Sequence, residues 1–292
     1  MRNFDQFIGI DWSGAKTPVF NKAISVSLAY QGSAPPSLVA GPWSRQKVAD
    51  WIINLSKNQK RILIGVDCNF GYAATTIQKQ FGTQATHKDL WDTVESACHN
   101  EPNFFAQKFW DNLAYAPDFW VSGKMRDGFE MPRRQTEIIC YESGFGKPES
   151  PFKLIGAKQV GKGGLSGMRM AHYLKKMLGH KIAFWPFEME LVNKANIVVT
   201  EIYPRQFLMR SGHGMTKIRD LADLNQTLRF LDAKPYSNAT LLSDHDTDSL
   251  ASAAGLRYLC GSLENIPKDI SHPPIMSYNA QHLEGWIFGV TG

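Results

Sequence analysis

The order of apolar and polar positions along the chain predicts an α/β fold. Short apolar runs typical of strands occupy residues 7–11, 22–30, 37–42, 61–67 and 197–202, with a last one, "GWIFGV", near the end. Periodic segments typical of helices occupy residues 44–57, 88–99, 166–178, 218–231 and a stretch from Ser243 onward. Ser44 is a good N-cap for the first of these helices. This order of elements predicts a mixed sheet, part meander and part crossover, flanked by helices.

The regular pattern is interrupted after Asp67 for more than a hundred residues. Residues 72–195 are rich in aromatic residues and glycine and include "NFFAQKFWDNLAYAPDFW". We interpret them as a long insertion or subdomain after the fourth strand, inside a single domain that spans residues 1–292.

Composition favours a soluble globular protein. The chain has 292 residues, 43% hydrophobic and 20% charged, and no stretch approaches the roughly 20 apolar residues of a membrane span. We therefore expect a cytoplasmic protein without a membrane partner. The four cysteines form no C-x-x-C pair, which argues against a zinc ribbon or a disulfide framework.

The positive charge is concentrated in the middle of the chain. Residues 124–169 hold nine Lys and Arg against five Asp and Glu, which is +4 of the net +5. A basic middle together with acids elsewhere suits a polyanion such as nucleic acid held over metal ions, although basicity of this size also serves solubility.

Three acids each end an apolar strand: Asp11, Asp67 and Glu201. One such aspartate is readily explained as a turn residue that accepts backbone N–H bonds. Three that converge at the carboxyl edge of a parallel sheet would raise one another's pKa, and a divalent cation would relieve that repulsion.

The stretch "SDHDTDSLASAAGLRYL" adds a fourth acid. Ser243 or Asp244 can cap the helix, and Asp246 suits its first turn. Asp248 lies a full turn in, on a face of small residues that should pack on the sheet, so we expect its carboxylate near the other three. His245 is either a proton shuttle or loose ligand, or a structural histidine.

Acids from two or more strands and one helix are typical of a two-metal site for phosphodiester cleavage, with Mg²⁺ or Mn²⁺ as the ions. The metal ligands would be Asp11, Asp67, Glu201 and Asp248, with His245 nearby as a catalytic residue.

The segments "IGIDWSGAK", "LIGVDCNFG", "VVTEIYPRQF", "HDTDSLASAAG" and "EGWIFGV" together resemble a family of uncharacterised proteins predicted to be ribonuclease H-like nucleases. "HDTDSLA" is also similar to the last-helix motif of Holliday-junction resolvases. The resemblance implies a ribonuclease H-like fold, with Asp11 as the central metal-bridging acid, Asp67 as the acid of the neighbouring strand, Asp248 as the last-helix ligand and Glu201 as a family-specific fourth. Holliday-junction resolvases dimerise, so a homodimer is an open expectation.

A glycine-rich basic segment, "FKLIGAKQVGKGGLSG", nearly matches a phosphate-binding loop, but Gly163 stands where a Ser or Thr should hold Mg²⁺. We interpret it either as a flexible loop that contacts substrate phosphates through Lys158 and Lys162 or as a plain surface turn. Arg205 in "EIYPR" meets a phosphate or pairs with Glu201.

Two other functions remain open from the sequence. "GIDWSGAK" also resembles the first phosphate loop of the actin and sugar-kinase superfamily, which implies an ATP-binding phosphotransferase. A non-catalytic module that binds nucleic acid is the second alternative.

Overall fold

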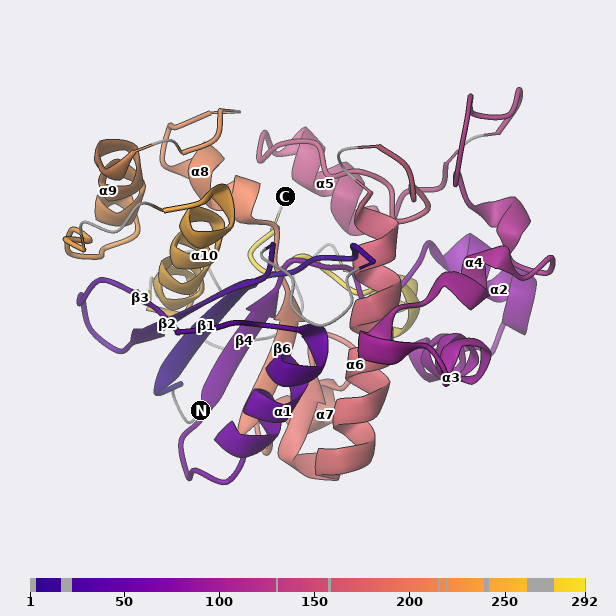
Figure 1. Ribbon diagram of the computed structural model, residues 1–292, viewed down its shortest axis with the longest axis horizontal. Coiled ribbons are helices and arrows are strands. Elements are labelled where there is room, and N and C mark those ends of the chain that lie inside the picture. Colours follow the sequence, from indigo (N-terminus) through magenta and orange to yellow (C-terminus); the bar gives the residue numbers. More distant parts are fainter. Residues whose placement is uncertain are drawn as a thin grey trace.

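The computed structural model describes residues 4–16, 23–129, 131–156, 159–214, 216–218, 220–238, 242–261 and 276–291. Its centre is a six-stranded mixed sheet with the strand order β3-β2-β1-β4-β6-β5 (Figure 1). The strands are β1 (Gln6–Asp11), β2 (Ser25–Tyr30), β3 (Ser37–Leu38), β4 (Ile62–Val66), β5 (Ile182–Phe184) and β6 (Ile197–Glu201). The predicted α/β class with a mixed sheet flanked by helices is confirmed.

The pairing of the strands brings the carboxyl ends of β1, β4 and β6 to one edge. β2 runs antiparallel to β1 and to β3, whereas β1, β4, β6 and β5 run parallel to one another. In register, Gly9 pairs with Gly65, and Val66 pairs with Glu201. The acids that end these strands therefore lie at the same edge of the sheet.

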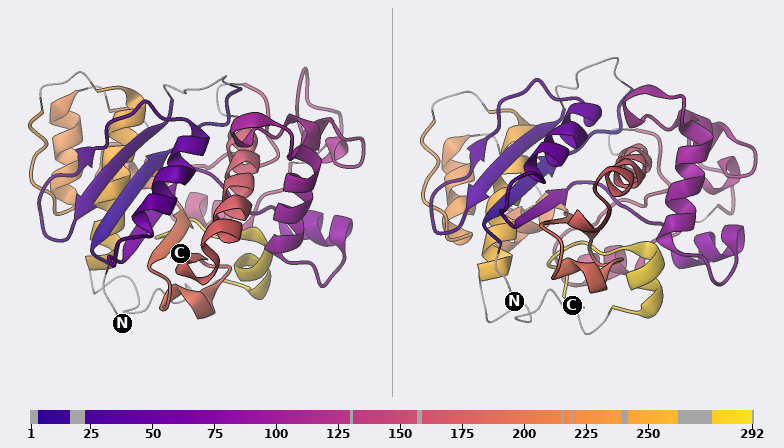
Figure 2. Two further views of the ribbon diagram at one scale, coloured as in Figure 1. Left: turned by 60° about the horizontal axis from the view of Figure 1, so that its bottom comes forward. Right: turned by 90° about the horizontal axis from the view of Figure 1, so that it is seen from below.

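Helices cover both faces of the sheet, as Figures 1 and 2 show. On one face lie α8 (Pro204–Arg210), α9 (Leu221–Phe230) and α10 (Asp244–Gly261), and on the other lie α1 (Arg45–Leu55), α3 (His87–Cys98) and α6 (Val160–Leu178). The remaining helical segments are α2 (Ala74–Phe81), α4 (Gln107–Asp111), α5 (Gln135–Glu142), α7 (Met189–Val192), η1 (Pro102–Phe104), η2 (Ala116–Asp118), η3 (Gly179–Lys181) and η4 (Ala280–Glu284).

Alternate residues of the strands enter two separate hydrophobic cores because side chains alternate between the faces of a strand. Phe7 of β1 and Val198 of β6 belong to the core with α8, α9 and α10. Ile8 of β1 and Val199 of β6 belong to the core with α1, α3 and α6. Buried on both faces, the central strands read in the sequence as continuous apolar runs.

Most predicted elements are present, but their bounds differ: the strand predicted over residues 37–42, for example, is only Ser37–Leu38. The predicted helix of residues 166–178 begins earlier, at Val160, and α9 begins at Leu221 behind its N-cap Asp220. The run "GWIFGV" is not a strand, because Ile287 makes only an isolated bridge to Glu201. The N-cap at Ser44 is confirmed, since its side chain accepts the amide of Lys47.

The segment of residues 72–195 is mainly helical but also supplies a strand of the central sheet. β5 pairs in parallel with β6 at the edge of the sheet. Helices α2, α3 and α4 lie together beyond α6 (Figure 1). The division into one domain with an insertion remains a prediction.

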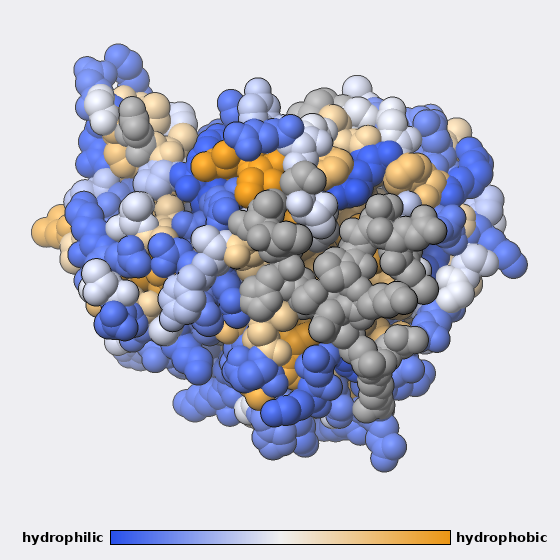
Figure 3. All heavy atoms as spheres, turned by 180° about the vertical axis from the view of Figure 1, so that it is seen from behind, coloured by the Kyte–Doolittle hydropathy of each residue, from blue (hydrophilic) through white to orange (hydrophobic). Residues whose placement is uncertain are grey.

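On the face seen from behind, the visible part formed by described residues is mainly hydrophilic, with small apolar areas between the polar side chains (Figure 3). The exposed large apolar side chains come from separate elements, among them Tyr30, Leu113, Tyr141 and Met177. Among the helices of the described residues, none combines the length and the apolar character that crossing a membrane requires.

Candidate functional site

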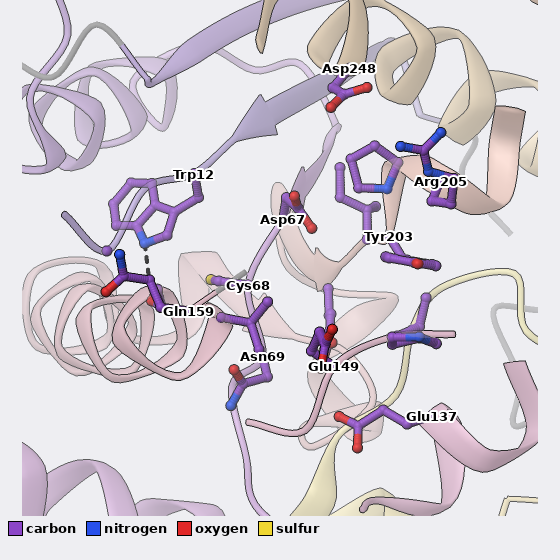
Figure 4. Close-up of a pocket in the computed structure, with 18 of the residues that line it drawn as sticks. Trp12, Asp67, Cys68, Asn69, Glu137, Glu149, Gln159, Tyr203, Arg205 and Asp248 are labelled. Atoms are coloured by element: carbon purple, nitrogen blue, oxygen red, sulfur yellow. Dashed lines mark hydrogen bonds between the residues drawn. The ribbon is translucent and has the colours of Figure 1, made fainter. Parts of the chain in front are cut away.

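A cavity of about 580 Å³ lies at the edge of the sheet where β1, β4 and β6 end. Its walls come from the turn after β1, the residues after β4 and β6, and parts of α5, α6 and α10 (Figure 4). Asp67, Glu201 and Asp248 line it. The predicted convergence of acids at this edge is therefore present, with members from two strand ends and one helix.

Asp67 and Asp248 are cavity carboxylates without a hydrogen-bond or ion-pair partner among the described residues. Within the described part of the chain, neither side chain accepts a hydrogen bond or forms an ion pair, and both face the same space (Figure 4). Burial raises the pKa of Asp67 well above its usual value, and the charges of Asp11, Asp248 and Glu201 raise it further. Burial and the charge of Asp11 raise the pKa of Asp248 to about 7, although the positive charges of Arg205 and Lys217 act in the opposite direction.

Asp11 lies next to this pair but is bonded to a histidine. His245 Nδ1 lies 2.5 Å from Asp11 Oδ2, while the Asp11 side chain is buried. Burial raises the pKa of Asp11 despite this contact, and the hydrogen bond to Asp11 raises the pKa of His245. The His245 side chain is 41% exposed, so it contacts both Asp11 and the solvent.

Close packing of α10 on β1 brings Asp248 to the edge of the sheet. A Cβ atom at Gly9 would lie 2.4 Å from the Ser249 carbonyl oxygen and 2.6 Å from the Ala253 nitrogen. The stripe that faces the strands is therefore the one with Ser249 and Ala253. The face with Asp248 that we predicted to pack on the sheet does so at Ser252, whose Cβ atom would lie 2.8 Å from a Cβ atom at Gly9. Gly255, farther along that face, packs on Phe207 of α8 instead, and Asp248 lies at the cavity beside the sheet edge.

The other acids at the start of α10 have structural partners. Ser243 and Asp246 form a reciprocal cap, in which the Ser243 amide donates to Asp246 and the Asp246 amide to Ser243 Oγ. Asp246 also accepts a hydrogen bond from Ser25 of β2 at 2.7 Å. Asp244 pairs with Lys217 at 2.5 Å. The capping role expected for Ser243 and the first-turn position expected for Asp246 are confirmed.

Glu201 is held by an arginine. Arg134 Nη2 lies 2.6 Å from Glu201 Oε1, and Arg134 Nη1 lies 2.7 Å from Glu201 Oε2. Arg134 Nε donates to Glu137 Oε1 at 2.8 Å, and burial raises the pKa of Glu137 to about 7. Among the described residues the salt-bridge partner of Glu201 is thus Arg134, so the interpretation of Arg205 as that partner is wrong.

Sequence reasoning missed Arg134 and Glu137. The only local signal is the spacing of these two residues, because Glu137 accepts the Arg134 amide as a capping residue three positions later. Nothing near Arg134 in the sequence indicates that its guanidinium would reach Glu201, which lies 67 residues away.

The residues expected to contact phosphates occupy different places. Arg205 lines the cavity and donates to the Thr216 carbonyl oxygen. Lys162 lies in the first turn of α6 with its ammonium 5.7 Å from the Trp110 ring centroid, and it does not line the cavity. Lys158 lies outside the described residues. Lys147 and Lys217, which the sequence did not single out, line the cavity.

The glycine-rich segment is largely helix rather than a flexible phosphate loop. Gly163 and Gly164 lie inside α6. A Cβ atom at Gly14 would lie 2.2 Å from the Gly163 nitrogen, and one at Gly164 would lie 2.0 Å from Asn69 Oδ1. These glycines let the start of α6 pack directly on the loops after β1 and β4, so the loop interpretation of Lys162 is wrong.

The donor set at the cavity fits a hard divalent cation. Mg²⁺ is typically bound by one or two carboxylates and several waters rather than by a cage of protein ligands. Asp67 and Asp248 supply two carboxylates that accept no hydrogen bond from the described residues and repel each other. No group of three or more His, Cys, Asp and Glu side chains in the described residues is arranged as a ready metal cluster.

No family model, curated protein or solved structure matches the chain.

Proposed function

We propose that this protein is a nuclease that hydrolyses phosphodiester bonds in DNA or RNA with Mg²⁺ or Mn²⁺ at the edge of a ribonuclease H-like sheet. The strand order supports this fold assignment: an antiparallel β1-β2-β3 meander is followed by parallel β4 beside β1 and parallel β6 beside β4. β1 ends at Asp11 and Asp67 directly follows β4, which are the positions that the resemblance implies for these acids.

One observation carries the proposal. Asp67 and Asp248, 181 positions apart in the sequence, border one cavity without a partner among the described residues, and Asp11 adds its negative charge to both. Charges placed together in this way destabilise a fold unless a cation or a proton compensates them. A site that retains acids at such a cost in folding stability is a candidate for metal-dependent chemistry.

The residues at the cavity would have separate roles in this hydrolysis. Asp67 and Asp248 would hold the ion with Asp11 beside them, and the ion when bound would polarise the phosphate and lower the pKa of a water molecule. His245, bonded to Asp11 and partly exposed, is placed to take up or release a proton. Arg205 and Lys217 on the cavity wall supply positive charge for substrate phosphates.

Nucleic acid is the proposed partner because of this charge distribution. The cavity wall includes Lys147, Arg205 and Lys217, and the chain has a net charge of +5. Phosphate contacts of this kind supply affinity without sequence preference. A homodimer remains a prediction, and a measurement of the protein's mass in solution tests it.

The test is cleavage of end-labelled single-stranded and double-stranded DNA and RNA with Mn²⁺ or Mg²⁺. Asp67→Asn and Asp248→Asn should each lower the rate at least about 100-fold, because the lost ligand removes several kcal/mol of transition-state stabilisation. Asp50→Asn is the matched control, since Asp50 is exposed on α1 and does not line the cavity. Equal cleavage by all three variants would contradict the proposal.

Binding assays on the same proteins distinguish the two alternative functions, a phosphotransferase and a non-catalytic module. ATP binding without metal-dependent cleavage would favour the phosphotransferase. Nucleic-acid binding that is insensitive to Asp11→Asn and lacks cleavage would favour the non-catalytic module.

A further inference from the structure

Glu201 belongs to the same edge of the sheet as the aspartates but points to the other side of its strand. Phe7, Gly9 and Asp11 alternate on the side of β1 that faces α10. Ile197, Val199 and Glu201 alternate on the side of β6 that faces the opposite core. Glu201 therefore lies on the opposite face of the sheet from the aspartates near α10, although it lines the same cavity.

Both carboxylate oxygens of Glu201 already have a cationic partner. Each accepts one hydrogen bond from Arg134, at 2.6 and 2.7 Å, in the two-point geometry that suits guanidinium and carboxylate. The guanidinium is 1% exposed and also donates to Glu137 and to the Glu284 carbonyl oxygen at 2.9 Å. The four hydrogen bonds that it donates to these three residues hold it in place.

The positive charge of Arg134 is permanent. Guanidinium groups do not lose their proton in proteins, and the two glutamates raise the pKa of Arg134 despite its burial. Withdrawing Glu201 to bind an ion would leave this buried cation with fewer negative partners, which is strongly destabilising.

We infer that the site takes one divalent ion, at Asp67 and Asp248 with Asp11 beside them, because Arg134 occupies the charge-compensating position at Glu201 that a second ion would need. This inference rests on the proposed function and replaces the two-metal expectation. Arg134 is a positioning residue for Glu201, and Glu201 is not a metal ligand.

The primary test counts bound Mn²⁺ on the intact wild-type chain. Isothermal titration calorimetry, together with the electron paramagnetic resonance signal of free Mn²⁺, gives the number of ions per chain without any need for turnover. We expect one ion. Two ions per chain would overturn the inference while leaving a metal-dependent nuclease in place, whereas no binding would overturn the proposed function itself.

A pair of variants tests the same point with matched chemistry. Glu201→Gln should bind Mn²⁺ within about threefold of the wild-type affinity, and Asp67→Asn should lose at least about tenfold. A loss in Glu201→Gln equal to that in Asp67→Asn would overturn the inference. Circular dichroism verifies that both variants are folded, and if Glu201→Gln does not fold, the wild-type count decides.

Discussion

His245 Nδ1 lies 2.5 Å from Asp11 Oδ2, so the first turn of α10 is bonded to the last residue of β1. The contact joins elements 234 residues apart in the sequence. It orients the carboxylate of Asp11 next to the pair formed by Asp67 and Asp248. A hydrogen-bond partner of a proposed ligand is expected to affect the ion through that ligand.

Replacing His245 tests this role. His245→Ala should lower Mn²⁺ affinity or cleavage by about 10–100-fold, which is the usual cost of losing the partner of a metal ligand. His172, which pairs with Asp92 on the helical side of the molecule, offers His172→Ala as a control. A His245→Ala protein with unchanged affinity and unchanged cleavage would show that the contact is only structural.

The raised pKa of Asp248 predicts a pH-dependent stability of the metal-free protein. Its pKa is about 7 in the folded protein, against 3.8 for the unperturbed group. Between these values the folded protein keeps a proton that the unfolded chain has released, so the free energy of unfolding falls as the pH rises from about 4 to 7.

Asp248→Asn removes this ionisation. Without metal, we expect the variant to be more stable than the wild type by about 1–3 kcal/mol at pH 8, with little difference at pH 4. Urea denaturation at both pH values measures this, with Asp50→Asn as the control. Adding Mn²⁺ should stabilise the wild type more than Asp248→Asn, because the ion binds only the folded state. A stabilisation of equal size at pH 4 and pH 8 would contradict the prediction.

Gly9 determines how closely α10 approaches β1. Its missing side chain leaves room for the backbone of Ser249 and Ala253. Gly9→Ala should therefore lower the free energy of unfolding by about 2–4 kcal/mol, as overpacking against a rigid backbone does, and should also weaken Mn²⁺ binding because Asp248 moves with the helix. Thermal denaturation and calorimetry measure the two effects.

Gly261, the last residue of the same helix, is the matched control. Beyond its own helix, a Cβ atom there would meet no atom of the described residues within 4 Å, so Gly261→Ala should be neutral or slightly stabilising, by less than about 1 kcal/mol. If both alanine variants had the same stability, close packing at Gly9 would not be what positions α10.

A buried histidine makes the fold sensitive to acid. Burial lowers the pKa of His87 to about 3, and its ring stacks on Phe187 with the ring centroids 4.4 Å apart. Below pH 6.5 the unfolded chain takes up a proton that the folded protein does not, so stability falls by up to about 1.4 kcal/mol for each unit that the pH drops toward 3.

His87→Phe should reduce this loss. The urea midpoint of the variant should fall less between pH 7 and pH 4.5 than that of the wild type. The same substitution at the exposed His99 should leave the fall unchanged. An identical fall in wild type and His87→Phe would mean that another group is responsible for the acid sensitivity.

The sequence by itself determined most of the central strands, several of the helices that cover them, and the acids at the strand ends. Continuous apolar runs identified β4 and β6, and the helical period with Ser44 as N-cap identified α1, because these signals arise from local spacing and burial. Asp11, Asp67 and Glu201 were identified for the same reason: an acid at the end of a buried strand stands out in the chain itself.

Only the tertiary structure decided which of these acids are left without a partner. Arg134 reaches Glu201 across 67 residues, and His245 reaches Asp11 across 234. The glycines of α6 serve contacts with the loops after β1 and β4 instead of a phosphate loop. Partner choice depends on distances between elements that are remote in sequence, and such distances are set by packing rather than by local pattern.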